Sequence, residues 1–265
     1  MLKLFNANQK NFSKKLEQIL NLRKLKQLDQ SSSVKKILYD VKKKGDKAVI
    51  KYERKFSNIK SKQKKIKFSN KEINSISKKI NRNLKRSIDI AYSRIRKFHL
   101  KQKISSFRFK NKFKNELSYR YSPIESVGVY VPGGTASYPS TVLMNCIPAL
   151  VAGVRNIYLT TPALGSSVNP AIIYAAKKCG VKEIYKTGGP HSIAALTYGT
   201  KTFKKVDKIV GPGNMFVASA KKEVFGDVGI EGMTAGPSEV TVVCDKFSNP
   251  EWVASDLIGQ AEHDI

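Results

Sequence analysis

From Ser126 onward, short apolar runs alternate with segments of helical periodicity, and this alternation limits the possible folds more than any other feature. SVGVYV (126–131) is typical of a strand buried on both faces, whereas NPAIIYAAKKCG (169–180) is typical of a helix closed by glycine. Strands separated by helices of roughly 8–14 residues indicate βαβ units in a mostly parallel sheet, and so an α/β fold. Strands, some running into turns, are expected at 126–131, 156–161, 182–189, 208–214 and 239–245, and helices at 141–154, 169–180, 192–199, 216–226 and 250–263.

The first 125 residues have a different pattern. Residues 34–56 predict two helices broken near Gly45 and Asp46, and apolar residues at spacings of three and four predict one long helix over 73–98. Alternating residues at 106–110 and 116–121 predict a two-stranded hairpin. We therefore expect a helical arm and a hairpin that pack against the α/β body.

The net charge of +29 is concentrated in the first 120 residues, which hold 37 Lys and Arg against 8 Asp and Glu, whereas the rest of the chain holds 12 of each. No RNP, zinc-finger or KH signature accompanies these charges. We interpret them as a solvated surface without a specific nucleic-acid partner, although weak attraction of polyanions at low salt is expected. A polyanion-binding module remains the alternative from a different functional class.

Cysteine usage and the absence of targeting segments suggest a cytoplasmic protein. Cys146, Cys179 and Cys244 lie far apart in apolar surroundings, which predicts buried thiols in a reducing compartment. The N-terminus lacks the apolar core of a signal peptide, and no stretch approaches the roughly 18 apolar residues of a membrane span.

Three predicted strand-to-helix junctions are rich in glycine: VPGGTASYPS (131–140), TGGPHS (187–192) and VGPGNMF (210–216). Such junctions bring backbone N–H groups close to a ligand beyond the carboxyl ends of the strands. They favour a nucleotide or a phosphorylated ligand. Neither GxGxxG nor a P-loop is present, so a kinase or an ATPase has no support.

Two further groups of residues could carry chemistry. Gln260 and His263 are three apart on a predicted helix and could both face one zinc ion, although such a pair is more often a surface feature and a zinc site needs further donors. Ser238 follows Gly236 and Pro237 in TAGPSEV, which from spacing alone indicates a turn into the next strand. No GxSxG elbow surrounds this serine.

Together, four segments resemble the signature blocks of the histidinol dehydrogenase family, in the family's order and spacing. They are GVYVPGGTASYPSTVLMNCIPALVAGV (128–154), DKIVGPGN (207–214), TAGPSEV (234–240) and SDLIGQAEHD (255–264). The resemblance implies a zinc- and NAD-dependent oxidation of L-histidinol through L-histidinaldehyde to L-histidine, with two NAD used in succession.

The resemblance also implies individual roles. Gln260 and His263 would be zinc ligands that also contact substrate, Ser238 would contact substrate, and Tyr130 and Asn214 would contact NAD. His191 stands where the family has a glutamine that contacts NAD. The sequence of residues 229–239 also departs slightly from the family's usual pattern.

The resemblance further implies two incomplete Rossmann-like, aldehyde dehydrogenase-like halves with an N-terminal helical arm, in a homodimer with swapped extensions. We expect a helical extension over 1–25, one incomplete domain formed by 26–127 and 241–265, and an NAD-binding domain over 128–240. The family's Glu-His acid/base pair and remaining zinc ligands would lie beyond Ile265. We therefore expect the 265 residues alone to be inactive, with exposed apolar surface on the incomplete domain. The alternatives are a zinc- and NAD-dependent dehydrogenase of another small polar alcohol, and a non-catalytic NAD- or polyanion-binding fragment.

Overall fold

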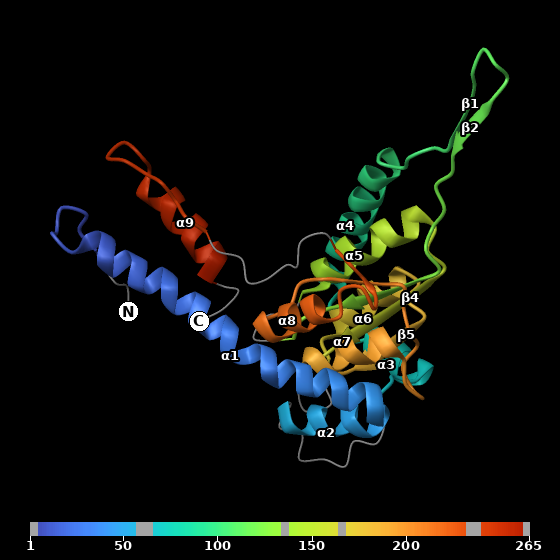
Figure 1. The fold of residues 1–265 in the computed structure, drawn as a ribbon, viewed down its shortest axis with the longest axis horizontal. Helices are drawn as coiled ribbons and strands as arrows, with labels where there is room; N and C mark the ends of the chain where they lie inside the picture. Colours follow the sequence, from blue (N-terminus) through green and yellow to red (C-terminus); the bar gives the residue numbers. More distant parts are fainter. Residues whose placement is uncertain (1–4, 57–65, 134–137, 164–167, 232–239, 262–265) are drawn as a thin grey trace.

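The computed structural model describes residues 5–56, 66–133, 138–163, 168–231 and 240–261, with the backbone alone for 19–30. Within these residues the chain forms an N-terminal helical arm, a parallel sheet covered by helices, a projecting hairpin and a separate last helix (Figure 1). The α/β fold and the helical arm are confirmed.

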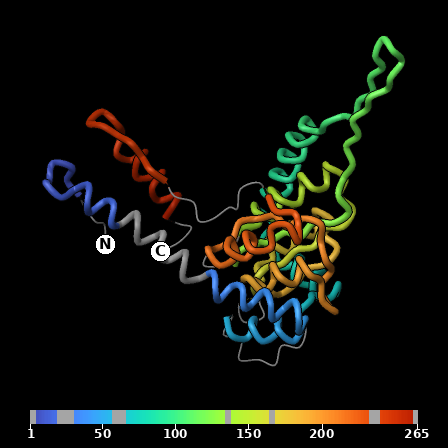
Figure 2. The backbone as a smooth tube through the Cα atoms, viewed as in Figure 1, coloured from blue at the N-terminus to red at the C-terminus, as the bar shows by residue number. Residues whose placement is uncertain are grey.

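The N-terminal arm begins with α1 (Phe12–Lys44) and α2 (Asp46–Phe56). The predicted break is confirmed at Gly45, whose φ of 54° is a conformation that glycine adopts without strain. The first turns of α1 lie well away from the sheet (Figure 2).

The single helix predicted over 73–98 is wrong, because the chain forms α3 (Asn70–Ser77) and then α4 (Arg82–Lys101). Asn81 causes the second start: its side chain accepts a hydrogen bond from the Asn83 N–H at 2.8 Å, a typical helix N-cap. The apolar spacing stays nearly in phase across the break, so periodicity alone did not reveal it.

The predicted hairpin is confirmed. Strands β1 (Phe107–Lys110) and β2 (Glu116–Tyr119) pair antiparallel, and every residue in them is exposed. Figure 1 shows the hairpin projecting far from the sheet.

The central sheet of the described residues has five parallel strands in the order β5-β4-β3-β6-β7. The two-residue β7 was not predicted. The strands are β3 (Ser126–Tyr130), β4 (Asn156–Thr161), β5 (Glu183–Lys186), β6 (Lys208–Val210) and β7 (Gly229–Ile230).

Two hydrophobic cores cover the two faces of this sheet. One core packs α5 and α6 against the sheet and continues outward to α3 and α4, with Val142, Ile173 and Ile88 among its members. The other packs α7 and α8 against the sheet and continues to α1 and α2, with Ile193 and Val217 among its members. The crossover helices are α5 (Pro139–Ala152), α6 (Pro170–Lys178), α7 (Gly189–Tyr198) and α8 (Met215–Glu223).

The C-terminal segment differs from its prediction. Residues 240–245 form no strand, and Val243 is 92% exposed, because no neighbouring strand pairs with this segment among the described residues. Cys244 is therefore exposed, contrary to expectation, whereas Cys146 and Cys179 are buried as predicted. The predicted final helix is present as α9 (Pro250–Ala261).

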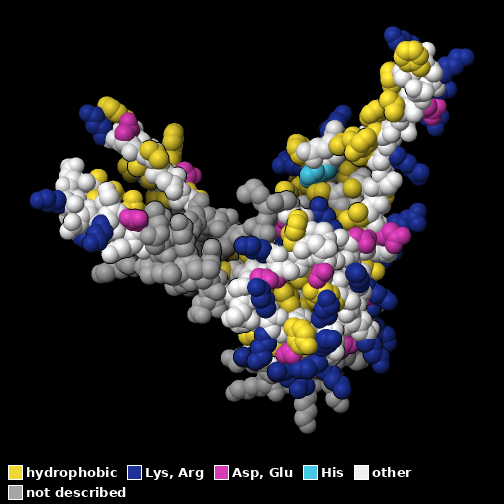
Figure 3. All heavy atoms as spheres, in the orientation of Figure 1, with side chains coloured by type: hydrophobic (Ala, Val, Ile, Leu, Met, Phe, Trp, Pro, Cys, Tyr) yellow, Lys and Arg dark blue, Asp and Glu magenta, His cyan; other side chains and the backbone are white. Residues whose placement is uncertain are grey.

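Exposed apolar surface is confirmed on the segments assigned to the incomplete domain, on the hairpin and α9 in particular (Figure 3). Across the described part of the chain, no helix has both the length and the apolar character needed to cross a membrane.

Candidate site at the carboxyl edge of the sheet

The order of the strands along the chain reverses direction between β3 and β6. From β3 the chain adds β4 and β5 on one side, then crosses to add β6 and β7 on the other. In open parallel sheets, ligands bind beyond the carboxyl ends of the strands at such a reversal. Tyr130 is the last residue of β3, and Asn214 precedes α8 directly after β6, so the fold places both predicted NAD contacts at this point.

Tyr130 is buried and remains a neutral phenol near pH 7. Burial raises the pKa of Tyr130 to about 12. Its hydroxyl oxygen accepts a hydrogen bond from the Gly189 N–H at 3.1 Å, which ties the end of β3 to the start of α7. The hydroxyl proton has no acceptor among the described residues, so it can serve a ligand.

The β6–α8 junction approaches β3 too closely for a side chain at Gly211. A Cβ there would lie 2.1 Å from the Tyr130 carbonyl oxygen, and the φ of Gly211 is 106°. The Gly211 N–H donates to Glu231 Oε2 at 3.0 Å, and buried Lys221 donates to both Glu231 and the Gly211 carbonyl oxygen. Burial lowers the pKa of Lys221, although its pairing with Glu231 opposes the shift. This glycine therefore serves internal packing.

Asn214 caps α8 while leaving a donor available. Its Oδ1 accepts from the Val217 N–H at 3.1 Å, which fixes the side chain at the start of the helix. Its amide NH₂ has no acceptor among the described residues, and the residue is exposed. A free amide donor beside the positive end of a helix suits a phosphate or hydroxyl oxygen.

His191 lies in α7 and is enclosed by α2. Its side chain is only 2% exposed, and its Nε2 lies 2.8 Å from Oε2 of Glu53. The same carboxylate oxygen accepts from the Thr187 hydroxyl at 2.6 Å and from the Gly188 N–H at 3.3 Å. The rings of Tyr52 and Phe56 pack around the imidazole, with centroids 6.3 and 5.9 Å away.

Glu53 therefore places an internal negative charge where a helix N-terminus would attract a ligand phosphate. A carboxylate can only accept, so His191 donates through Nε2, and its buried Nδ1 has no partner among the described residues. Sequence reasoning missed Glu53. A signal was present, because Glu53 is four residues after buried Val49 on one face of α2.

Of the residues predicted to contact zinc and substrate, Gln260 alone lies among the described residues, and it is not at this edge. Gln260 lies near the end of α9, which has no buried residue and stands apart from the sheet in Figure 1. Ser238 and His263 fall outside the described residues. Within the described ranges, no group of three or more His, Cys, Asp or Glu side chains could hold a metal. One neutral amide on an exposed helix does not make a zinc centre.

Comparison with known proteins agrees with the sheet and with the motifs on its edge. A family model described as histidinol dehydrogenase matches residues 21–265. The chain is 59% identical over 264 residues to histidinol dehydrogenase of Pelagibacter ubique, and the aligned region covers 100% of this chain and 61% of the relative. It is 44% identical over 254 residues to the Agrobacterium fabrum enzyme, covering 96% of this chain and 59% of the relative.

A solved structure agrees as well. The crystal structure of histidinol dehydrogenase from Elizabethkingia anophelis superposes with a TM-score of 0.80 at 43% identity, over 88% of this chain and 53% of that one. The chain thus spans about three fifths of the length of the curated relatives it matches. With a family match over nearly its whole length and a common fold, this chain belongs to the histidinol dehydrogenase family.

Proposed function

We propose that residues 128–240 form the NAD-binding part of an enzyme that oxidises L-histidinol through L-histidinaldehyde to L-histidine. The observation that carries this proposal is the placement of Tyr130 at the carboxyl end of β3 and of Asn214 in the turn after the neighbouring β6, each with a donor that no described residue accepts. NAD, when bound, would accept the hydride from the alcohol and then from the aldehyde. The chain's own part is to hold the dinucleotide with these donors and with the start of α8.

His191 supports this binding indirectly in our proposal. Its Nε2 is engaged by Glu53 and its ring is covered by α2, so it shapes the start of α7 beside Tyr130. A direct contact with NAD, which the family's glutamine would make, requires the free Nδ1 to become accessible.

The zinc and substrate contacts of Gln260, His263 and Ser238 remain proposals that rest on the family resemblance. Two ligands are fewer than the three or four protein ligands of known zinc sites. We therefore propose that residues 1–265 alone bind NAD but do not oxidise histidinol. The assignment of 26–127 and 241–265 to a second Rossmann-like domain, after a helical extension over 1–25, is likewise proposed.

A homodimer is also proposed, and the hairpin supports it. Its strands leave Phe107, Phe109, Leu117 and Tyr119 exposed, and Phe113 is exposed in the turn between them. Apolar side chains gathered on a projecting element are typical of a surface covered by a partner. Light scattering after size exclusion should give twice the chain mass, and a monomer at micromolar concentration would contradict this.

The NAD proposal is tested by calorimetric titration of NAD into the protein and two variants. Asn214→Ala should weaken binding about 2- to 10-fold, as expected for one net hydrogen bond. Tyr130→Phe should weaken it similarly, because the Gly189 N–H also loses its acceptor. Asn83→Ala, at an exposed asparagine of α4, is the matched control and should leave affinity unchanged. Absence of NAD binding, or equal affinities in all variants, would refute the proposal.

A further inference from the structure

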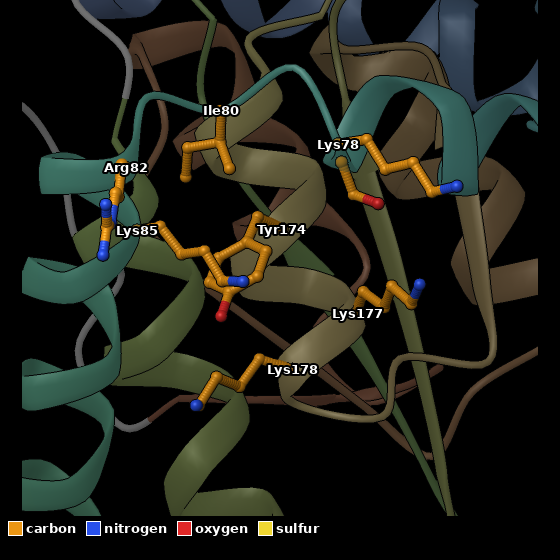
Figure 4. Close-up of a pocket in the computed structure, with 8 residues that line it drawn as sticks. Lys78, Ile80, Arg82, Lys85, Tyr174, Lys177 and Lys178 are labelled. Atoms are coloured by element: carbon orange, nitrogen blue, oxygen red, sulfur yellow. The ribbon is translucent and has the colours of Figure 1, made fainter.

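A pocket lies between the turn that joins α3 to α4 and the last turns of α6. It is a pocket of about 730 Å³, within the range typical of small-molecule sites. Because α6 runs back from the carboxyl edge of β4, its last turn lies toward the opposite edge from Tyr130. The pocket is lined by Ser77, Lys78, Ile80, Arg82, Lys85, Tyr174, Lys177 and Lys178 (Figure 4).

The lining carries five cationic side chains, and among the described residues one carboxylate forms an ion pair with any of them. Lys178 donates to Asp89 Oδ1 at 2.5 Å, and the Tyr174 hydroxyl donates to the same oxygen at 2.7 Å. Lys178 holds the pKa of Asp89 below its ordinary value, so this carboxylate stays ionised. Five positive charges against one negative charge leave an excess of four around the pocket.

Three of the cations form no close ion pair within the described part of the chain, although Lys85 lies near enough to Asp89 to help lower the pKa of that carboxyl. Lys78, Arg82 and Lys85 form no ion pair with any described residue, and Lys177 donates only to the neutral Asn74 Oδ1 at 2.8 Å. The first turn of α4, which begins at Arg82, contains no acidic residue. Cations at the positive end of a helix are unfavourable unless an anion lies nearby.

The geometry selects the kind of anion. Lys85 lies over the Tyr174 ring, 5.6 Å from its centroid, so this ring is covered by a charge and offers a base little surface for stacking (Figure 4). Figure 4 shows Lys78 and Lys177 on one side of Tyr174, Arg82 on the other and Lys178 below it. Cations spread around one hollow suit several phosphate groups on one compact molecule. We propose that this pocket binds a small anion carrying two or more phosphate groups.

Tripolyphosphate is the probe for this proposal, titrated calorimetrically into the protein at about 150 mM salt, where the Debye length is ~8 Å. The double variant Lys78→Ala, Lys85→Ala should weaken binding at least about tenfold, since each lysine would make a charge-assisted contact. The matched control removes two exposed cations from the last turns of the same helix, as Lys97→Ala, Lys101→Ala. It should change affinity less than about twofold, because it lies outside the pocket.

Several outcomes would overturn the proposal. Equal weakening in the two double variants would assign binding to diffuse charge, and inorganic phosphate binding as tightly as tripolyphosphate would indicate an adventitious ion only. Displacement of the probe by single-stranded RNA at lower concentration than by unlabelled tripolyphosphate would point to nucleic acid. The two tests are distinguished by their variants: Tyr130→Phe and Asn214→Ala lie outside the pocket and should leave tripolyphosphate affinity unchanged, whereas Lys78→Ala, Lys85→Ala should leave the NAD affinity assigned to Tyr130 and Asn214 unchanged.

Discussion

Replacing Glu53 with alanine should destabilise the fold far more than its position on a short helix suggests. One carboxylate oxygen accepts from Thr187, Gly188 and His191, and the glutamate side chain is 9% exposed. Each buried donor left without an acceptor costs about 1–3 kcal/mol, so removing the acceptor shared by these three groups should cost about 3–5 kcal/mol. At roughly 2–4 °C per kcal/mol for a domain of this size, the melting temperature should fall by about 6–20 °C.

A double-mutant cycle shows whether this loss comes from the pair. Urea unfolding followed by circular dichroism gives the free energy of unfolding of Glu53→Ala, His191→Ala and the double variant. Since the two side chains are in contact, their effects should miss additivity by about 0.5–3 kcal/mol. Glu17→Ala, at an exposed glutamate of α1 without an ion pair among the described residues, is the matched control and should change stability little.

Two results would refute this reasoning. One is a Glu53→Ala protein within about 1 kcal/mol of wild type, the typical effect of an ordinary substitution. The other is additivity of the two single effects within about 0.5 kcal/mol, as expected for independent sites.

Two further substitutions test the close backbone packing at Gly211 and the hydrogen bonds of Asp40. Gly211→Ala should destabilise by several kcal/mol, because its Cβ would meet the Tyr130 carbonyl and its φ is positive, and thermal melts would show no change if the close approach were absent. Hydrogen bonds, the larger from Lys44 and the next from Tyr52, lower the pKa of Asp40 from 3.8 to about 2. As the pH falls, Asp40 is therefore protonated in the unfolded chain before it is protonated in the folded one. The stabilisation is full above pH ~4 and is lost as the pH falls toward 2, so Asp40→Asn should flatten the decline of melting temperature in that window; an unchanged slope would contradict the assignment.

Much of the α/β body could be predicted because each buried strand runs directly into a turn and a helix of matching period. The incorrect predictions lie where strand pairing or helix capping determines the secondary structure. Residues 240–245 have the composition of a strand but no neighbour to pair with, and β7 is too short for a periodic signal. At Asn81 a single side-chain hydrogen bond restarts a helix without disturbing the apolar stripe.

The position of the candidate site could be predicted from the sequence, but the surroundings of His191 could not. Tyr130 and Asn214 lie at one edge of the sheet because the carboxyl ends of parallel strands share an edge, which the motif positions already implied. His191 was placed at the correct junction, but its environment depends on α2, more than 130 residues earlier in the chain. A carboxylate on the buried face of an otherwise ordinary helix is a local signal that something must pair with it, and Glu53 could have been flagged on that ground.

The arrangement of α9 shows why Gln260 and His263 need more than helical spacing. A separation of three residues sets only a shared direction for the two side chains, whereas their distance from the carboxyl edge of the sheet depends on what the helix packs against. In α9, Trp252 is 73% exposed and Ile258 is also exposed, and no residue is buried by the rest of the described chain. Exposed apolar side chains of this size favour a covering surface. The face that covers Trp252 and Ile258 will therefore decide how far Gln260 lies from Tyr130 and Asn214.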